Sequence, residues 1–176
     1  MKEKTQRSIL SGIFSAIIAI FSWIQIPSAV PFTLQTLGVY LCCGVLGGKT
    51  ALLSVLSYIA LGLIGLPVFS SFSGGVGAIF GATGGFIIGF LFIPLSVWVI
   101  EKTPYKAHSL ILGGSLGTAL CYISGISWYS LIYMKGSVGL AAAFITCVLP
   151  FMIPDTVKLI VSWIVSKQIK PKISSL

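Results

Sequence analysis

The stretch that determines the fold class of this chain is A-I-F-G-A-T-G-G-F-I-I-G-F-L-F-I-P-L-S-V-W-V-I, from Ala78 to Ile100. It contains no charged residue. The hydrocarbon core of a bilayer is about 30 Å thick, and a helix needs roughly 20 apolar residues to cross it. This stretch is therefore predicted to be a transmembrane helix, and similar stretches recur along nearly the whole chain.

The composition agrees with a membrane protein. Of the 176 residues, 56% are hydrophobic and 8% are charged, and the mean hydropathy is +1.07. A soluble domain carries about 25% charged residues, so soluble enzymes, ATPases and nucleic-acid-binding domains are excluded for this chain. The net charge of +8 does not indicate a nucleic-acid partner, because the basic residues lie at the ends of the apolar runs and so report membrane topology.

We predict an all-α integral membrane protein, a single domain over residues 1–176 with six transmembrane helices. Between Lys135 and Lys167 the chain is too long for one helix, and Pro150 fits the first turn of the last span. The predicted spans are about 8–26, 34–47, 51–66, 78–100, 109–134 and 150–167, with a short interfacial helix at about 138–149. The first apolar run is too long for a signal-peptide core, so we expect it to remain as the first span.

The distribution of Lys and Arg predicts the orientation. One side of the membrane receives Lys2, Lys4, Arg7, Lys49, Lys102, Lys106, Lys167, Lys170 and Lys172, and the other side receives Lys135. Because basic loops stay on the cytoplasmic side, both termini are expected to be cytoplasmic. The loops at 27–33, 67–77 and 135–149 are then expected to face outward.

Asp155 and Lys158 are the one acid and the one base that these spans place inside the membrane. Either charge costs about 2.5–3.5 kcal/mol at mid-bilayer on insertion scales. Spaced three residues apart, they share one helix face in the outward half of the last span. They are either an ion pair that anchors this helix or a polar site for a small molecule with N–H groups and a carboxylate.

Small residues form a smooth stripe on the fourth predicted span. They recur every four residues, at Gly77, Gly81, Gly85 and Gly89. Such a stripe lets another helix approach closely, and its outward end could also contact a ligand.

A second smooth surface lies on the cytoplasmic half of the first span. It consists of Gly12, Ser15, Ala16 and Ala19. It is either ordinary packing within the chain or a docking face for another membrane protein.

No catalytic set, metal site or cofactor site is expected. The cysteines lie in apolar segments without ligand spacing, at Cys42, Cys43, Cys121 and Cys147. Glu101 and His108 have no partners that would make a catalytic set. The segment G-V-L-G-G-K-T, residues 44–50, is not a phosphate-binding loop, because Cys43 stands where that loop requires glycine and a membrane helix precedes it.

Four motifs in order resemble the BioY family, the biotin-specific substrate-capture subunits of energy-coupling factor (ECF) vitamin transporters. They are P-F-T-L-Q-T (31–36), G-L-P-V-F followed by S-G-G (65–75), G-A-T-G-G-F (81–86) and P-F-M-I-P-D-T-V-K (150–158). The family form of the third motif is G-P-T-G-G-Y, so this chain differs at Ala82 and Phe86. The family's D-x-x-K motif matches Asp155 and Lys158, and the resemblance implies that they bind biotin.

The resemblance also implies six helices, a location in a prokaryotic plasma membrane, and docking on a membrane coupling subunit driven by two cytosolic ATPase subunits. The family contact is a small-residue pattern on the first helix, which this chain offers as Gly12 with Ala16 and Ser15 with Ala19. The chain is thus predicted to be a non-enzymatic biotin-uptake subunit. The alternatives are capture of another small vitamin, or a self-sufficient ion-coupled transporter that uses Asp155.

A bicyclic, mostly apolar ligand such as biotin needs aromatic and backbone walls around a few polar groups. Residues near the outward ends of the spans could supply these walls, although the aromatic ones could instead form an interfacial belt that faces lipid. The candidates are Phe32, Gln35, Phe69, Ser73, Gly74, Gly75, Tyr122 and Trp128.

Overall fold

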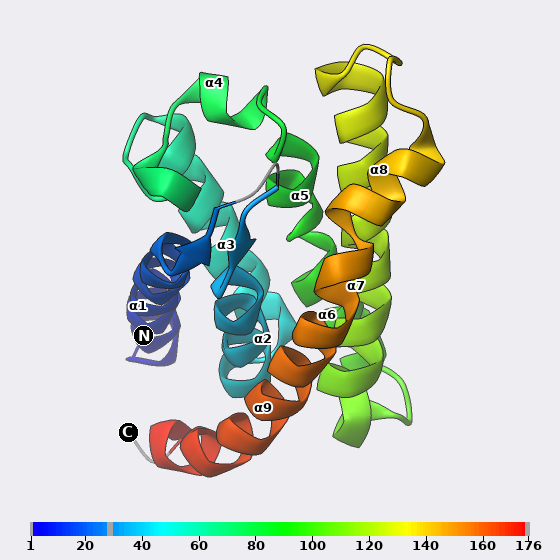
Figure 1. Ribbon diagram of the computed structural model, residues 1–176. Helices are drawn as coiled ribbons and strands as arrows, with labels where there is room; N and C mark the ends of the chain where they lie inside the picture. The colour runs from blue at the N-terminus through cyan, green and yellow to red at the C-terminus, as the bar shows by residue number, and fades with distance from the viewer. Residues whose placement is uncertain (1, 28–29, 175–176) are drawn as a thin grey trace.

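The structure, a computed structural model, describes residues 2–27 and 30–174. It is a bundle of helices with a small β-hairpin at one end (Figure 1). In chain order the elements are α1 (Lys2–Trp23), β1 (Gln25–Ile26), β2 (Phe32–Thr33), α2 (Gln35–Leu46), α3 (Gly48–Leu63), η1 (Ser70–Phe72), α4 (Val76–Ile79), α5 (Gly84–Gly89), α6 (Phe92–Glu101), η2 (Lys106–His108), α7 (Ser109–Ser127), η3 (Trp128–Tyr133), α8 (Leu140–Cys147) and α9 (Leu149–Ser174). β1 and β2 pair antiparallel. β2 lies in the predicted loop 27–33, whereas β1 occupies the end of the predicted first span 8–26, because α1 already ends at Trp23. Ser28 and Ala29 lie outside the described residues.

Four helical segments of the described chain are long and apolar enough to cross a membrane. They are Thr5–Trp23, Gly84–Glu101, Lys106–Tyr133 and Leu149–Lys172. Between the first two lie the shorter apolar helices α2, with 12 residues, and α3, with 16. α2 falls within the predicted span 34–47, whereas α3 begins at Gly48, before the predicted span 51–66, and ends at Leu63. Both helices are shorter than the ~20 residues of an average spanning helix.

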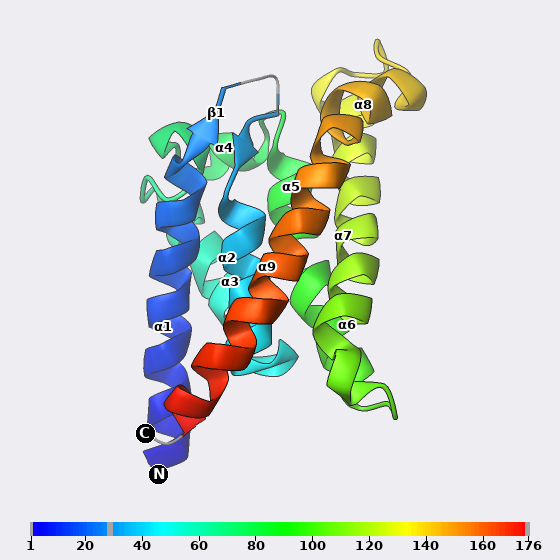
Figure 2. The same ribbon diagram turned by 60° about the horizontal axis from the view of Figure 1, so that its bottom comes forward.

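The two ends of the bundle differ. Figure 2 shows both termini at one end, here called the terminal end, together with the α2–α3 and α6–α7 connections. Lys102 and Lys106 lie in the α6–α7 connection, and Lys49 lies in the first turn of α3. The hairpin, α4 and α8 lie at the opposite end, here called the hairpin end, as does the loop after η3 that contains Lys135 (Figure 2).

The segment 78–100 is not one continuous helix. It forms the end of α4, then α5 and α6, with breaks at residues 80–83 and 90–91. Pro94 lies in the first turn of α6, where its missing N–H is tolerated, and this favours a break just before the helix. Side chains of α7 and η3 satisfy carbonyls around the first break, because the Ser124 hydroxyl of α7 donates to the Gly85 carbonyl (2.9 Å) and the Trp128 Nε1–H of η3 donates to the Gly81 carbonyl (3.2 Å). Irregular backbone at membrane depth is tolerated only where such partners exist.

Glycines set the distance between α6 and α7, which pack along each other. A Cβ at Gly117 would lie 2.4 Å from the Ile93 Cα, and one at Gly113 would lie 2.5 Å from the Val97 Cα. The glycines of the predicted stripe on the fourth span differ in how closely they pack against neighbouring elements. Gly85 and Gly89 pack against α7, whereas a Cβ at Gly77 would meet nothing within 4 Å.

We predict that Gly117→Ala destabilises the protein by about 1–3 kcal/mol, because the added methyl group meets backbone atoms that cannot turn aside. Gly12→Ala is the matched control in another long helix, since a Cβ there would meet nothing within 4 Å. Thermal unfolding in detergent should show a lower midpoint for Gly117→Ala and an equal or higher midpoint for Gly12→Ala. Equal midpoints for both variants would contradict the close approach of α6 and α7.

Candidate substrate-binding site

The first turns of α2 and α9 meet at the hairpin end and bring the charged residues of α9 next to threonines at the start of α2. Asp155 and Lys158 lie in the second and third turns of α9, one turn apart on the same face. The first turn of α2 supplies Thr36, and Thr33 precedes it, with the Thr33 hydroxyl accepting the Gln35 N–H (3.2 Å). The packing of α2 on α9 fixes these pieces relative to each other.

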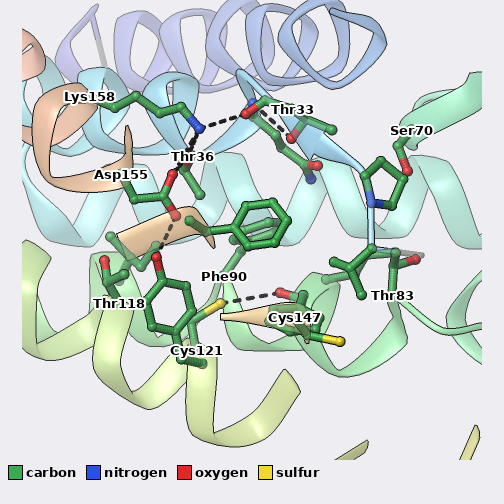
Figure 3. Close-up of a pocket in the computed structure, with 18 of the residues that line it drawn as sticks. Thr33, Thr36, Ser70, Thr83, Phe90, Thr118, Cys121, Cys147, Asp155 and Lys158 are labelled. Atoms are coloured by element: carbon green, nitrogen blue, oxygen red, sulfur yellow. Dashed lines mark hydrogen bonds and ion pairs between the residues drawn. The ribbon is translucent and has the colours of Figure 1, made fainter. Parts of the chain in front are cut away.

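Asp155 and Lys158 form a buried ion pair, with 4% and 7% of their surfaces exposed. The Lys158 Nζ donates to the Asp155 Oδ1 (2.8 Å), to the Thr36 hydroxyl (3.0 Å) and to the Thr33 carbonyl (2.7 Å). The Thr36 hydroxyl donates in turn to the Asp155 Oδ1 (2.8 Å), and the Tyr122 hydroxyl to the Asp155 Oδ2 (2.7 Å). Figure 3 shows Lys158 and Asp155 pointing toward Thr36 and Thr33. The three N–H groups of the ammonium and both carboxylate oxygens are therefore engaged.

Aromatic rings cover the ammonium group. The Lys158 Nζ lies 4.2 Å from the centroid of the Phe32 ring, at the distance of a cation–π contact. Phe32 stacks on Phe151 of α9 at a centroid distance of 5.8 Å. The hairpin is thus fastened to α9 by the Thr33 carbonyl and by a ring.

The ion pair lies at the edge of a pocket with a volume of about 60 Å³. The lining comes from the hairpin, α2, the loop before η1, α5, α6, α7, the end of α8 and α9 (Figure 3). Most of its walls are apolar, and the lining residues are Val30, Pro31, Thr33, Gln35, Thr36, Phe69, Ser70, Thr83, Phe86, Ile87, Phe90, Ile93, Thr118, Cys121, Tyr122, Cys147, Phe151, Asp155 and Lys158. An apolar pocket with a few convergent polar groups is typical of a small-molecule site.

A model of the BioY family matches residues 1–175 of the chain. The chain belongs to the BioY family. It is 35% identical to the "Biotin transporter BioY" of Thermotoga maritima over 166 residues, which cover 92% of this chain and 94% of that protein. It is also 35% identical to the "Probable biotin transporter BioY" of Pyrococcus horikoshii over 168 residues, 95% of this chain and 98% of that one.

A solved structure is similar over nearly the whole fold. It is described as the crystal structure of the S-component for biotin from an ECF-type ABC transporter. The TM-score is 0.84 at 27% identity, with 97% of this chain and 93% of that chain covered. These relatives are transporters, and this BioY-family chain is accordingly a transport protein and not an enzyme.

Five of the ten wall and ion-pair residues predicted from the sequence line the pocket of this BioY-family chain. They are Gln35, Phe69, Tyr122, Asp155 and Lys158. The amide nitrogen of Gln35 donates to the Tyr58 hydroxyl (2.8 Å), which fixes the orientation of this buried side chain. Phe32 is not among the lining residues but contacts the ion pair from outside.

Ser73, Gly74 and Gly75 shape the loop 67–77 and do not line the pocket. The Ser73 hydroxyl donates to the Ser70 carbonyl (2.7 Å), and the Gly75 N–H donates to the Gly62 carbonyl (2.7 Å). Gly75 has φ +83°, which glycine adopts without strain. These contacts hold Phe69 and Ser70, which do line the pocket, in place.

Trp128 is likewise absent from the lining. It lies against α5, where a Cβ on Gly85 would come within 2.3 Å of the Trp128 Cβ, and its ring tilts against Phe80 at a centroid distance of 6.1 Å. Its indole is therefore a support for the broken segment around Gly81.

Several polar and aromatic wall residues were not predicted from the sequence. Thr33 and Thr36 belong to the motif 31–36, Phe86 to 81–86 and Phe151 to 150–158, so all four lie inside motifs that were already singled out. The signal that could have found Thr36 is its place one residue after Gln35 in the first turn of α2. Phe90 and Thr118 lie in uniformly apolar or small-residue runs and carry no such signal.

Of the four residues predicted to form a docking face on the first helix, two are buried by the packing of α1 on α3 and two are exposed. Ser15 and Ala19 are buried, and the Ser15 hydroxyl donates to the Ser54 carbonyl of α3 (2.8 Å). Gly12 and Ala16 are exposed, and a Cβ at Gly12 would meet nothing within 4 Å. Ser15 and Ala19 thus take part in packing within the chain, whereas Gly12 and Ala16 lie on the surface of α1 that faces away from the bundle.

The described residues contain no group of three or more His, Cys, Asp or Glu side chains that could hold a metal ion. The four cysteines are buried and free, at Cys42, Cys43, Cys121 and Cys147.

We predict strong coupling between Asp155 and Lys158 in stability. Removing one charge leaves the other buried without its partner, at a cost of about 3–5 kcal/mol, whereas removing both costs less. Unfolding midpoints in detergent should therefore be lower for Asp155→Leu or Lys158→Met alone than for the double variant. Additive effects would contradict the mutual dependence of the two charges.

Proposed function

We propose that this chain binds biotin in the pocket beside Asp155 and Lys158 and takes it up as the substrate-specific subunit of an ATP-driven ECF transporter. The observation that carries the proposal is the buried ion pair at the edge of a mainly apolar pocket, at the D-x-x-K position of a BioY-family chain. The names of the two relatives as biotin transporters, and the similarity to a solved S-component for biotin, support the choice of biotin.

The chemistry of biotin fits the groups in the pocket. Its ureido ring presents N–H donors and a carbonyl acceptor, its sulfur ring is apolar, and its tail ends in a carboxylate. The Asp155 carboxylate can accept from the ureido N–H groups, and the Lys158 ammonium can donate to an anionic or carbonyl oxygen. Phe69, Phe86 and Phe90 supply apolar surface for the rings.

Binding must rearrange the site, because the polar groups already bond one another. A ligand donor that reaches Asp155 competes with Thr36 or Tyr122, and a ligand acceptor at Lys158 competes with the Thr33 carbonyl. The pocket volume of about 60 Å³ is also below the ~300–1,000 Å³ of typical ligand sites. Release of Thr33 by Lys158 would remove one of the contacts between the hairpin and α9 and leave the stacking of Phe32 on Phe151, so we assign the hairpin as the wall that shifts.

We predict that Asp155→Asn and Lys158→Gln each weaken biotin binding by about tenfold or more, since each removes one charge-assisted hydrogen bond of roughly 1.5–3 kcal/mol. Lys167→Gln is the matched control, with the same change on the same helix outside the pocket lining. Titration calorimetry of the purified chain in detergent measures the affinities.

Unchanged biotin affinity in both folded site variants would leave Asp155 and Lys158 with a structural role only. Lipoate, thiamine and riboflavin should bind far more weakly than biotin to the unmodified chain. Tight binding of one of these vitamins would identify that vitamin, and not biotin, as the substrate.

We further infer six membrane spans, with α2 and α3 as the two short ones, and cytoplasmic termini. The support is the gathering of Lys49, Lys102 and Lys106 at the terminal end, as the positive-inside rule requires for a cytoplasmic face. The pocket at the hairpin end would then open toward the outside of the cell, and the membrane would be a prokaryotic plasma membrane.

We propose that the coupling subunit docks on the surface of α1 that faces away from the bundle. Gly12 and Ala16 are exposed there and, with no large side chain, permit a close approach of another helix. The two cytosolic ATPase subunits would supply the energy, since the sequence contains no nucleotide-binding loop.

We predict that Ala16→Trp keeps biotin binding by the isolated chain but abolishes copurification with the coupling subunit and ATP-dependent uptake, because a bulky ring blocks helix approach. Leu116→Trp is the control, since Leu116 is half exposed on α7. Uptake by Ala16→Trp equal to that of the control would reject this docking surface. Accumulation driven by an ion gradient, in liposomes with this chain alone, would favour the ion-coupled alternative.

A further inference from the structure

A second cavity, of about 490 Å³, lies at the terminal end and shares no lining residue with the biotin pocket. It lies among α1, the α2–α3 junction, the end of α6 and α9, and Figure 2 shows α1 and α9 converging at this end. Its lining residues are Gln6, Arg7, Leu10, Val45, Leu46, Gly47, Lys49, Thr50, Glu101 and Lys170. We refer to it as the basic cavity.

One wall of the basic cavity is a close contact between the end of α6 and the start of α3. A Cβ at Gly48 would lie 2.2 Å from the Trp98 N atom, so only glycine allows this approach. The Gly48 N–H donates to both oxygens of the Glu101 carboxylate (3.1 Å each). Glu101 therefore occupies the N-terminus of α3, where a carboxylate is favoured by the helix dipole.

Among the described residues, the lining has three basic side chains, Arg7, Lys49 and Lys170, and one acidic side chain, Glu101. The three basic residues come from three different helices, α1, α3 and α9. Among the described side chains, Lys49 and Lys170 have no ion-pair partner. Like charges brought together repel one another, and an anion between them would lower that cost.

The remaining lining is apolar and reaches toward the membrane. Leu10, Val45 and Leu46 contribute hydrocarbon surface to the cavity. One turn along α1 from Leu10, Ile13 is half exposed on the surface of the helix. A ligand of matching chemistry has an anionic group joined to hydrocarbon chains.

We propose that the basic cavity binds the phosphate headgroup of an anionic phospholipid, with Lys49 and Lys170 as its main cationic contacts. Basic pockets between membrane helices on the cytoplasmic side bind such headgroups, and each Lys or Arg near an anionic surface adds to the attraction. A phospholipid fits better than an acidic protein segment because part of the cavity wall is hydrocarbon and the cavity lies among the ends of membrane helices.

The test compares two double variants of the full chain purified in detergent. Lys49→Gln/Lys170→Gln removes two charges from the cavity, and Lys102→Gln/Lys106→Gln removes two charges from the same end outside it. Each protein is titrated with dioleoyl-phosphatidylglycerol, dioleoyl-phosphatidylcholine, glycerol 3-phosphate and inorganic phosphate while its thermal midpoint is recorded. Native mass spectrometry then measures which lipid is retained from an equimolar mixture of the two phospholipids.

Phosphatidylglycerol should raise the midpoint of the unmodified chain and of the control at similar concentrations. The cavity variant should need about tenfold more phosphatidylglycerol for the same rise in the midpoint, or show no rise. In native mass spectrometry it should no longer retain phosphatidylglycerol in preference to phosphatidylcholine. If both double variants lose the stabilisation by phosphatidylglycerol equally, the effect comes from the general surface charge of this end, and the proposal is overturned. So would stabilisation by phosphate or glycerol 3-phosphate equal to that by phosphatidylglycerol, which would assign a soluble anion.

A protein occupant gives a different result. If phosphatidylglycerol has no effect while the cavity variant alone loses copurification with a coupling subunit, the cavity is a protein contact and the lipid proposal fails. Biotin affinity should be unchanged in both double variants, so this outcome is separable from a failure of the biotin site.

Discussion

The rest of the structure depends on one buried ion pair, Asp155 with Lys158, in a chain whose other charged residues lie toward the ends of its helices or in the connections between them. A membrane interior tolerates these two groups because each satisfies the other and the surrounding hydroxyl groups complete the set. The pair also fixes the geometry around it. Lys158 holds the hairpin through the Thr33 carbonyl, and Asp155 holds α7 through Tyr122, so α2, α7, α9 and the hairpin meet at one point.

This arrangement joins the chemistry of the site to the mobility that binding requires. When every polar group of a buried cluster has a hydrogen-bond partner, the free-energy penalty of burial is small. A ligand can then enter the cluster only by replacing existing partners with its own polar groups. A molecule without both a donor and an acceptor would break these bonds without compensation. In the proposed binding mode, the ion pair would select against apolar molecules of the size of biotin, while Phe86 and Phe90 of the pocket wall would contribute affinity without polar selectivity.

Much of this could be predicted from the sequence, for identifiable reasons. Apolar length and charge placement predicted a membrane protein made of helices, and the rarity of charge in these spans singled out Asp155 and Lys158. The break within 78–100 could not be read from apolar length, because it depends on side chains from α7 and η3, such as Ser124 and Trp128, that satisfy the freed backbone. The packing roles of Ser15 and Ala19 depend on the rotation of α1 against α3, which their spacing alone leaves open.

The central claim is that biotin binds at the ion pair by exchanging partners with it. A crystal structure of the chain grown with biotin tests this most directly. The account predicts biotin in the pocket, with a polar atom within hydrogen-bonding distance, about 3.2 Å or less, of the Asp155 carboxylate or the Lys158 ammonium. It also predicts that at least one of the bonds to Thr33, Thr36 or Tyr122 is lost. Biotin bound elsewhere, with all of these bonds intact, would contradict it.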